Sequence, residues 1–143
     1  MKKLLVIEEE RERNRAMEDL LKEEEVLQAY DWAITGNEAW GFLSDNSYAA
    51  VSFDIMVKKG DGPNIVEQVM RKQMGLFLLR KLRGGAFENH GTPRDVPVVV
   101  FSAITNEEDI KEIKGLLGAN GFFFQKPFDP IQVLAKLKEL MSV

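Results

Sequence analysis

The chain has 143 residues, of which 45% are apolar and 29% charged, and these figures predict one globular domain that is long enough to bury a core. Its 19 Lys and Arg against 23 Asp and Glu give a net charge of −4, so we expect no nucleic-acid or membrane partner, because such partners normally require a basic patch. The absence of cysteine excludes disulfides, thiolate nucleophiles and cysteine zinc sites, and the single His90 excludes histidine clusters.

The apolar runs are too short to cross a bilayer, and the first residues lack the pattern of a signal peptide. We therefore expect a cytoplasmic protein whose chemistry uses carboxylates, hydroxyls and lysine.

Short apolar runs alternate with longer stretches of helical periodicity from one end of the chain to the other. The first half predicts a strand at 4–7, a helix at 11–22, a strand at 26–30, a helix at 37–43 and a strand at 49–53. The second half predicts a helix at 63–83, a strand at 96–101, a helix at 105–117 beginning in a capping box, a strand at 121–125 and a helix at 131–141.

The third of these helices is unusually long. Asp61 is the expected cap and Pro63 lies in its first turn, and apolar residues recur at helical spacing from Ile65 to Leu82, before Gly84. At 1.5 Å per residue the helix would extend over about 31 Å.

Five apolar strands that alternate with five helices favour a parallel sheet covered on both faces, that is, a doubly wound α/β fold. In such sheets ligands bind beyond the carboxyl ends of the strands. Glu8 and Glu9 follow the first strand, Asp54 ends the third, Ser102 the fourth, and Lys126 follows the fifth. Four strands therefore bring carboxylates, a hydroxyl and an ammonium group to one edge.

These groups suit phosphoryl transfer. Clustered carboxylates favour a divalent cation such as Mg²⁺, and an aspartate carboxylate can attack phosphorus. The cation, the ammonium group and the hydroxyl can then stabilise charge on the phosphoryl oxygens. No glycine-rich nucleotide loop is present.

Four segments resemble the receiver domain of two-component response regulators, which has a flavodoxin-like (βα)5 fold: 4–10, 53–56, 98–103 and 118–128. The resemblance extends over nearly the whole chain and implies one receiver domain at residues 1–143 without an output domain. It further implies a phosphoacceptor signalling domain rather than an enzyme, which catalyses only its own phosphorylation and dephosphorylation.

The resemblance also implies roles for single residues. Asp54 would be the phosphoacceptor, Glu8 and Glu9 would bind the metal together with Asp54 and the carbonyl of Met56, and Ser102 and Lys126 would stabilise the phosphoryl group. Phe123 would be the aromatic switch, although three successive Phe in a strand are also typical of a core.

Three features depart from the family pattern. In the family, at least the second residue of the acidic pair is usually Asp, whereas here the pair is Glu8-Glu9. The geometry of metal binding must therefore differ, and both Mg²⁺ and Mn²⁺ are candidate cofactors. Lys58-Lys59 stands where a Pro is expected, and these ammonium groups either assist phosphate binding, partly replace the metal or are simply solvated. The helix predicted at 63–83 is about three turns longer than expected and would offer a surface to a partner.

The sequence leaves three functions open. The first is a stand-alone receiver that is phosphorylated by a sensor histidine kinase or a phosphotransfer protein and is recognised by a downstream protein partner. The second is a degenerate receiver that acts as an interaction module without phosphorylation. The third is a flavodoxin-like enzyme, against which the acidic residues after the first strand argue, because they would repel a phosphate.

Overall fold

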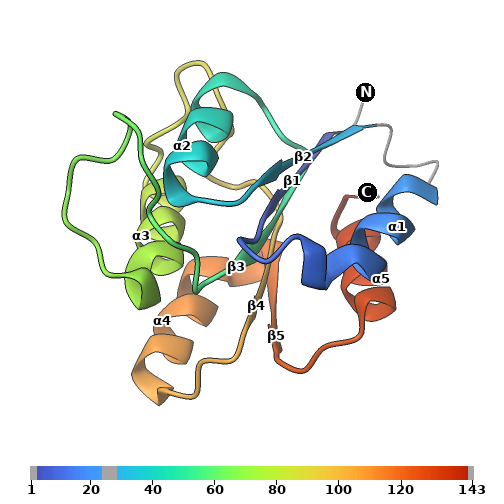
Figure 1. The fold of residues 1–143 in the computed structure, drawn as a ribbon. Coiled ribbons are helices and arrows are strands. Elements are labelled where there is room, and N and C mark those ends of the chain that lie inside the picture. The colour runs from blue at the N-terminus through green and yellow to red at the C-terminus, as the bar shows by residue number, and fades with distance from the viewer. Residues whose placement is uncertain (1–2, 24–28, 142–143) are drawn as a thin grey trace.

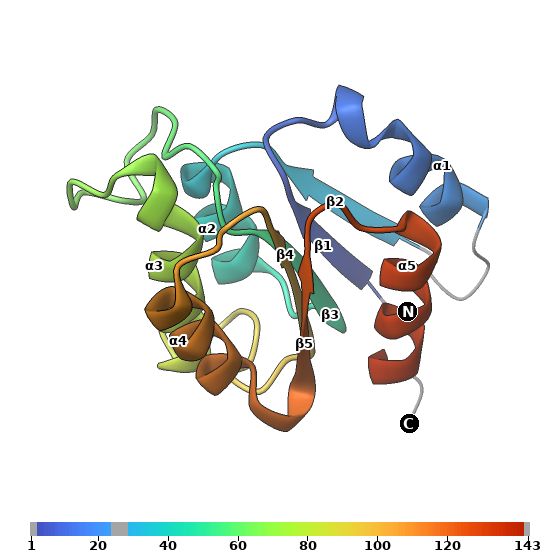
Figure 2. The ribbon, with the colours of Figure 1, turned by 90° about the horizontal axis from the view of Figure 1, so that it is seen from below.

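The computed structural model describes residues 3–23 and 29–141 and forms one parallel sheet between two layers of helices (Figures 1 and 2). The sheet order is β2-β1-β3-β4-β5. The strands are β1 (Lys3–Ile7), β2 (Ala29–Ala33), β3 (Ala50–Asp54), β4 (Val98–Ser102) and β5 (Gly121–Gln125). The predicted doubly wound α/β fold is therefore confirmed.

Five α-helices connect and cover the strands. They are α1 (Arg15–Glu23), α2 (Gly36–Asp45), α3 (Arg71–Arg83), α4 (Glu107–Leu117) and α5 (Pro130–Met141), with short 3-10 turns at Glu12–Asn14 and Gly118–Asn120. Helices α1 and α5 lie on one face of the sheet, and α2, α3 and α4 lie on the other (Figure 2).

Most predicted elements lie within a few residues of their observed positions. The second strand, predicted at 26–30, runs from Ala29 to Ala33, and residues 26–28 of that prediction lie outside the described residues. The cap of α4 is Asn106, whose side chain accepts a hydrogen bond from the N–H of Asp109, so the helix begins at Glu107 rather than at Thr105.

The sheet carries a separate apolar core on each of its faces. The larger core joins alternate residues of the strands to α2, α3 and α4, and includes Phe53, Leu78 and Val100. The smaller core, which includes Val6 and Leu137, joins the opposite side chains of the sheet to α1 and α5. Because both faces are buried, the central strands β3 and β4 are buried at every position, as their mainly apolar sequences predict.

The prediction of a long third helix is wrong. Helix α3 begins at Arg71, eight residues later than the predicted start, and residues 55–70 form an irregular connection instead. Ile65 is buried, but Val66 is 78% exposed and Met70 is also exposed, so the apolar residues of this segment do not form one helical face.

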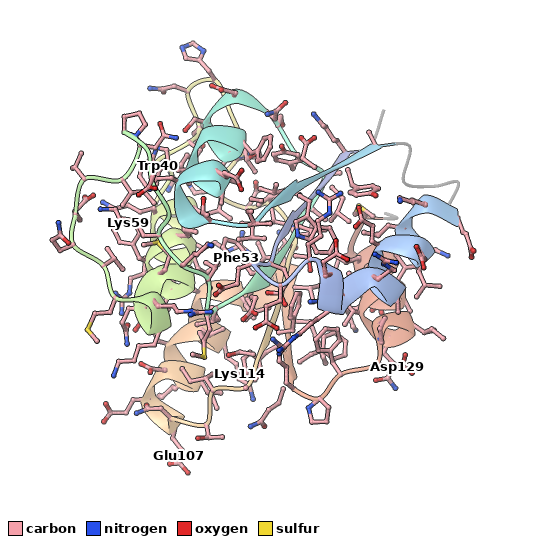
Figure 3. The ribbon with its side chains drawn as sticks, in the orientation of Figure 1. Trp40, Phe53, Lys59, Glu107, Lys114 and Asp129 are labelled. Carbon is pink, nitrogen blue, oxygen red and sulfur yellow. The ribbon has the colours of Figure 1, made fainter. Side chains whose placement is uncertain are left out.

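Hydrogen bonds to the start of α2 explain why this segment is not helical. The carbonyls of Lys58 and Lys59 accept from the backbone N–H groups of Gly36 and Asn37, and the Asn37 side chain binds Lys59, Gly60 and Ile65. These bonds fix residues 58–65 against α2, and the exposed Val66 and Met70 offer no apolar face that a helix could bury. Gly60, whose φ angle is +75°, turns the chain in this connection before the predicted start of the helix. In Figure 3, Lys59 lies on this connection at the periphery of the molecule, whereas Phe53, next to Asp54 in the chain, lies in the interior.

No helix in the described part of the chain is both long enough and apolar enough to cross a membrane.

Candidate functional site

Asp54 and Lys126 meet at the carboxyl edge of the sheet, although they lie 72 residues apart in the chain. Asp54 is the last residue of β3 and only 4% exposed. Its Oδ2 lies 3.1 Å from Nζ of Lys126, and its Oδ1 accepts a hydrogen bond of 3.0 Å from the N–H of Met56. Both carboxylate oxygens therefore have a partner, and the ammonium group is one of them.

Glu8 is the second carboxylate of this group, and it is 1% exposed. Its Oε1 accepts a hydrogen bond of 2.7 Å from the Asn14 amide and lies 3.9 Å from Nζ of Lys126. Its Oε2 is buried and has no hydrogen-bond partner among the residues that the structure describes. A buried oxygen without a donor is costly when ionised, so the site has room for a proton or a cation at this position.

The pKa of Glu8 reflects this environment. Burial is the largest cause and, together with the neighbouring Asp54 carboxylate, raises the pKa from 4.5 to about 8. Lys126 and Asn14 oppose the shift but do not cancel it. A pKa of about 8 favours the protonated form of Glu8 at neutral pH.

Glu9 has a different partner. Its Oε1 accepts from Nε and Nη2 of Arg71, at 2.9 and 2.7 Å, and this ion pair ties the end of β1 to the first residue of α3. Among the described residues, no group of three or more acidic, histidine or cysteine side chains is arranged to hold a metal ion. The structure thus brings together Glu8, Asp54 and Lys126, whereas the carboxylate of Glu9 is paired with Arg71.

Ser102 is fully buried at the end of β4, next to the strand that carries Asp54. Its hydroxyl accepts from the N–H of Ile104, and its carbonyl accepts from the N–H of Lys126, 2.7 Å away. The peptide bond between Lys126 and Pro127 is cis. These contacts fix the backbone from which the ammonium group reaches Asp54.

A second network holds the acidic loop after β1 in place. Trp32 on β2 donates its indole N–H to the carbonyl of Glu8, at 2.8 Å. The Arg11 guanidinium lies over the Trp32 ring and binds both carboxylate oxygens of Glu18, which also accepts from the hydroxyl of Tyr30. These contacts lower the pKa of Glu18 to about 2, with Arg11 as the largest cause, so the pair remains charged at neutral pH.

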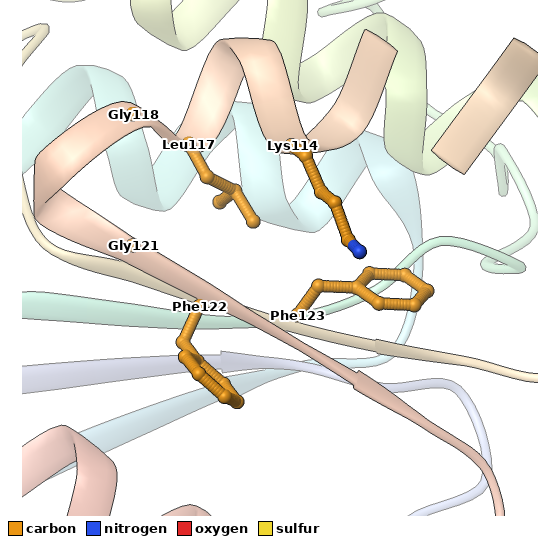
Figure 4. Close-up of a pocket in the computed structure, with 6 residues that line it drawn as sticks. All are labelled: Lys114, Leu117, Gly118, Gly121, Phe122 and Phe123. Atoms are coloured by element: carbon orange, nitrogen blue, oxygen red, sulfur yellow. The ribbon is translucent and has the colours of Figure 1, made fainter. Parts of the chain in front are cut away.

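Phe123 is half-buried on β5 and packs against the larger core. It lines a cavity of about 270 Å³ between β5 and α4, together with Lys114, Leu117 and Phe122. In Figure 4 the Phe123 ring lies beside Lys114, whereas Phe122 points to the opposite side of the strand. Phe122 there contacts Lys136 of α5. A cavity therefore adjoins the predicted switch residue.

The sequence did not identify three of the groups that shape this site: Arg71, Asn14 and Trp32. Arg71 was placed inside a helix, so its contact with Glu9 had no sequence signal. Asn14 follows six residues after Glu8 on a 3-10 turn, and only the tertiary path of that turn directs its amide back to the carboxylate.

A cavity of about 530 Å³ opens over this edge of the sheet, and its lining includes Glu8, Asn14, Lys126 and Phe128. Glu8 and Lys126 therefore line a space that a small anion or metal ion can enter.

Comparisons with known proteins support the same fold. No protein-family model matches the sequence, and no curated protein matches it. Among solved structures, the receiver domain of the Francisella response regulator 1452 aligns with a TM-score of 0.71 and 20% identity, over 99% of this chain and 97% of the other. The non-phosphorylated HemR receiver domain from Leptospira biflexa aligns with a TM-score of 0.72 and 19% identity, over 100% and 96%.

A receiver domain of a histidine kinase from Syntrophus aciditrophicus aligns at a TM-score of 0.69 and 21% identity, over 99% of this chain and 91% of that one. At such identities the comparison establishes the fold, which is that of receiver domains, and the alignments extend over nearly the whole chain.

Proposed function

We propose that this chain is a receiver module that accepts a phosphoryl group on Asp54 from a sensor histidine kinase or a phosphotransfer protein. The observation that supports this proposal best is the contact of 3.1 Å between Asp54 and Lys126 at the carboxyl edge of a receiver-type sheet. A buried carboxylate with one adjacent ammonium group has a nucleophile and a charge stabiliser in one place.

The reaction is a transfer between two side chains. An oxygen of Asp54 attacks the phosphorus of a phosphohistidine on the donor protein, so that an O–P bond forms while the P–N bond breaks and its electron pair returns to the imidazole. Lys126 contributes positive charge beside the phosphoryl oxygens, and Ser102 offers a hydroxyl on the next strand. The chain is a phosphoacceptor in this scheme and acts on no other substrate.

The donor set suits a hard cation such as Mg²⁺ or Mn²⁺. The unpartnered Oε2 of Glu8 and the carboxylate of Asp54 are oxygen ligands, and Met56 adds a backbone carbonyl in the adjacent connection. A bound cation would neutralise charge on the phosphoryl group and on both carboxylates. Glu9 could join as a ligand only after it leaves Arg71.

The signal would leave the domain through protein contacts. A phosphoryl group adds charge of about −2 beside Ser102, and this charge favours one of two packings of α4 against β5. Phe123 and the cavity between α4 and β5 lie in this region and are the proposed responsive part.

Incubation with acetyl phosphate and Mg²⁺, followed by intact-mass measurement, tests the proposal. We expect a gain of one phosphoryl group, which the Asp54→Asn variant should lose. Asp61→Asn, which changes an exposed aspartate on the neighbouring connection, is the matched control and should still gain the group. A gain that persists in Asp54→Asn would assign the phosphoacceptor elsewhere.

A degenerate receiver is the second candidate, and one observation favours it. The ion pair with Arg71 occupies Glu9, one of the predicted metal ligands, and the part of the chain that the structure describes holds no cluster of three or more acidic, histidine or cysteine side chains suited to a metal ion. Absence of any mass gain with either Mg²⁺ or Mn²⁺ would support an interaction module without phosphorylation.

A further inference from the structure

We propose that Arg71 is a built-in counter-cation that competes with the metal ion for Glu9, so that metal binding is coupled to the start of α3. This inference rests on the proposed metal-dependent function. It adds a residue that neither the sequence pattern nor the resemblance to receiver domains assigns to the site.

The geometry of the pair supports a specific contact. Arg71 approaches Glu9 through two nitrogens, Nε and Nη2, and both bind the same oxygen, Oε1. The Glu9 side chain is only 10% exposed, whereas that of Arg71 is 58% exposed. The carboxylate is thus mostly buried next in the chain to Glu8, and the arginine reaches it from solvent and can leave without a large loss of packing.

The positions of the two partners explain why the contact affects the metal site. Glu9 follows directly after Glu8, whose buried Oε2 is the unpartnered oxygen of the site. Arg71 is the first residue of α3, directly after the irregular connection that begins at Asp54. While the pair is closed, the site offers the carboxylates of Glu8 and Asp54, and when it opens Glu9 becomes the third.

Charge gives the coupling its sign. A divalent cation near Glu8 and Asp54 attracts Glu9 and repels the Arg71 guanidinium, so metal binding and the ion pair oppose each other. By reciprocity, the pair weakens metal binding by the same factor by which the metal weakens the pair. The Arg71 side chain at the start of α3 is then released from the end of β1 when the site is filled.

Binding of Mn²⁺, followed by electron paramagnetic resonance of the free ion, tests this inference without any phosphodonor. A half-exposed ion pair contributes little, so we expect Arg71→Gln to bind Mn²⁺ about twofold to fivefold more tightly than the natural chain. Arg71→Lys, which keeps the charge, should remain close to the natural chain. Arg80→Gln is the matched control, because it breaks an ion pair of the same kind with Glu112 about 14 Å further along α3 and should change nothing.

A second measurement reports the motion itself. In a nitrogen-15 spectrum, the Nε–H resonance of Arg71 should shift on addition of Mg²⁺, while that of Arg80 should not. Equal Mn²⁺ affinity of the natural chain and Arg71→Gln, together with weaker binding by Glu9→Gln, would overturn the role of Arg71 and leave the metal site intact. Absence of Mn²⁺ binding in both the natural chain and Arg71→Gln would overturn the inference and the metal-dependent function together.

Discussion

Replacement of Glu8 by glutamine should stabilise the metal-free protein, and the gain should grow as the pH rises. In the folded chain Glu8 keeps its proton up to a pKa of about 8, whereas in the unfolded chain it loses the proton near 4.5. Between these values the folded state binds one more proton than the unfolded state, so the free energy of unfolding of the natural chain falls as the pH rises. Glutamine has no such titration.

The magnitude follows from the shift. Each pKa unit corresponds to about 1.4 kcal/mol, so the advantage of Glu8→Gln should increase by about 3 kcal/mol between about pH 5 and about pH 7.5. The Glu8 side chain is only 2% exposed, so screening by water reduces this value little. The contact with Asn14 survives in the variant, because the glutamine amide oxygen also accepts a hydrogen bond.

Urea denaturation in the presence of a chelator, monitored by tryptophan fluorescence across this pH range, measures the effect. Glu112→Gln is the control, because Arg80 lowers the pKa of that carboxyl and its titration lies at lower pH. An advantage of Glu8→Gln that does not change with pH would refute the claim that the buried carboxyl carries a proton. Saturating Mg²⁺ should make the stability of the natural chain independent of pH in this range, since a cation can take the place of the proton on Glu8.

Three further substitutions test the supporting structure by equilibrium denaturation. Lys126→Met should lower the free energy of unfolding by about 1–2 kcal/mol at neutral pH and raise the pKa of Glu8 further, because it removes the ammonium group between two buried carboxylates. Unchanged stability would show that the ion pair of Lys126 with Asp54 is energetically neutral. Arg83→Met should cost about 2–4 kcal/mol, since its guanidinium donates to carbonyls that end α4 and precede β4; Arg83→Lys should recover only part, and full recovery would contradict the need for a planar donor. Gly75→Ala should destabilise the protein by more than about 2 kcal/mol, because the added Cβ would lie 2.4 Å from Cα of Ile55. Gly115→Ala should instead stabilise α4 by about 0.5–1 kcal/mol, because nothing lies within 4 Å of its added Cβ. Similar effects of the two substitutions would refute the steric argument.

The sheet and the residues on its edge were predictable from the sequence, because both depend on local patterns. Continuous apolar runs such as residues 98–101 occur where both faces of a strand are buried, and alternation with helices leaves few topologies. Parallel strands then place their carboxyl ends together, so the sequence alone predicts Asp54 and Lys126 at one edge of the sheet. Their contact of 3.1 Å agrees with that expectation.

The start of α3 and the partners of the acidic residues were decided by tertiary contacts. Residues 63–70 have helical periodicity, but the Asn37 side chain donates to the carbonyl of Lys59 and accepts from the N–H of Ile65, and these bonds hold the connection in another shape. Likewise, the sequence places Glu8 and Glu9 side by side without distinguishing them. Only the folded chain buries the first beside Asp54 and brings Arg71, 62 residues away, to the second. Hydrophobic periodicity indicates which residues are buried. The ion-pair partner of a charged side chain depends instead on which distant segment packs against it, and a local sequence pattern does not contain that information.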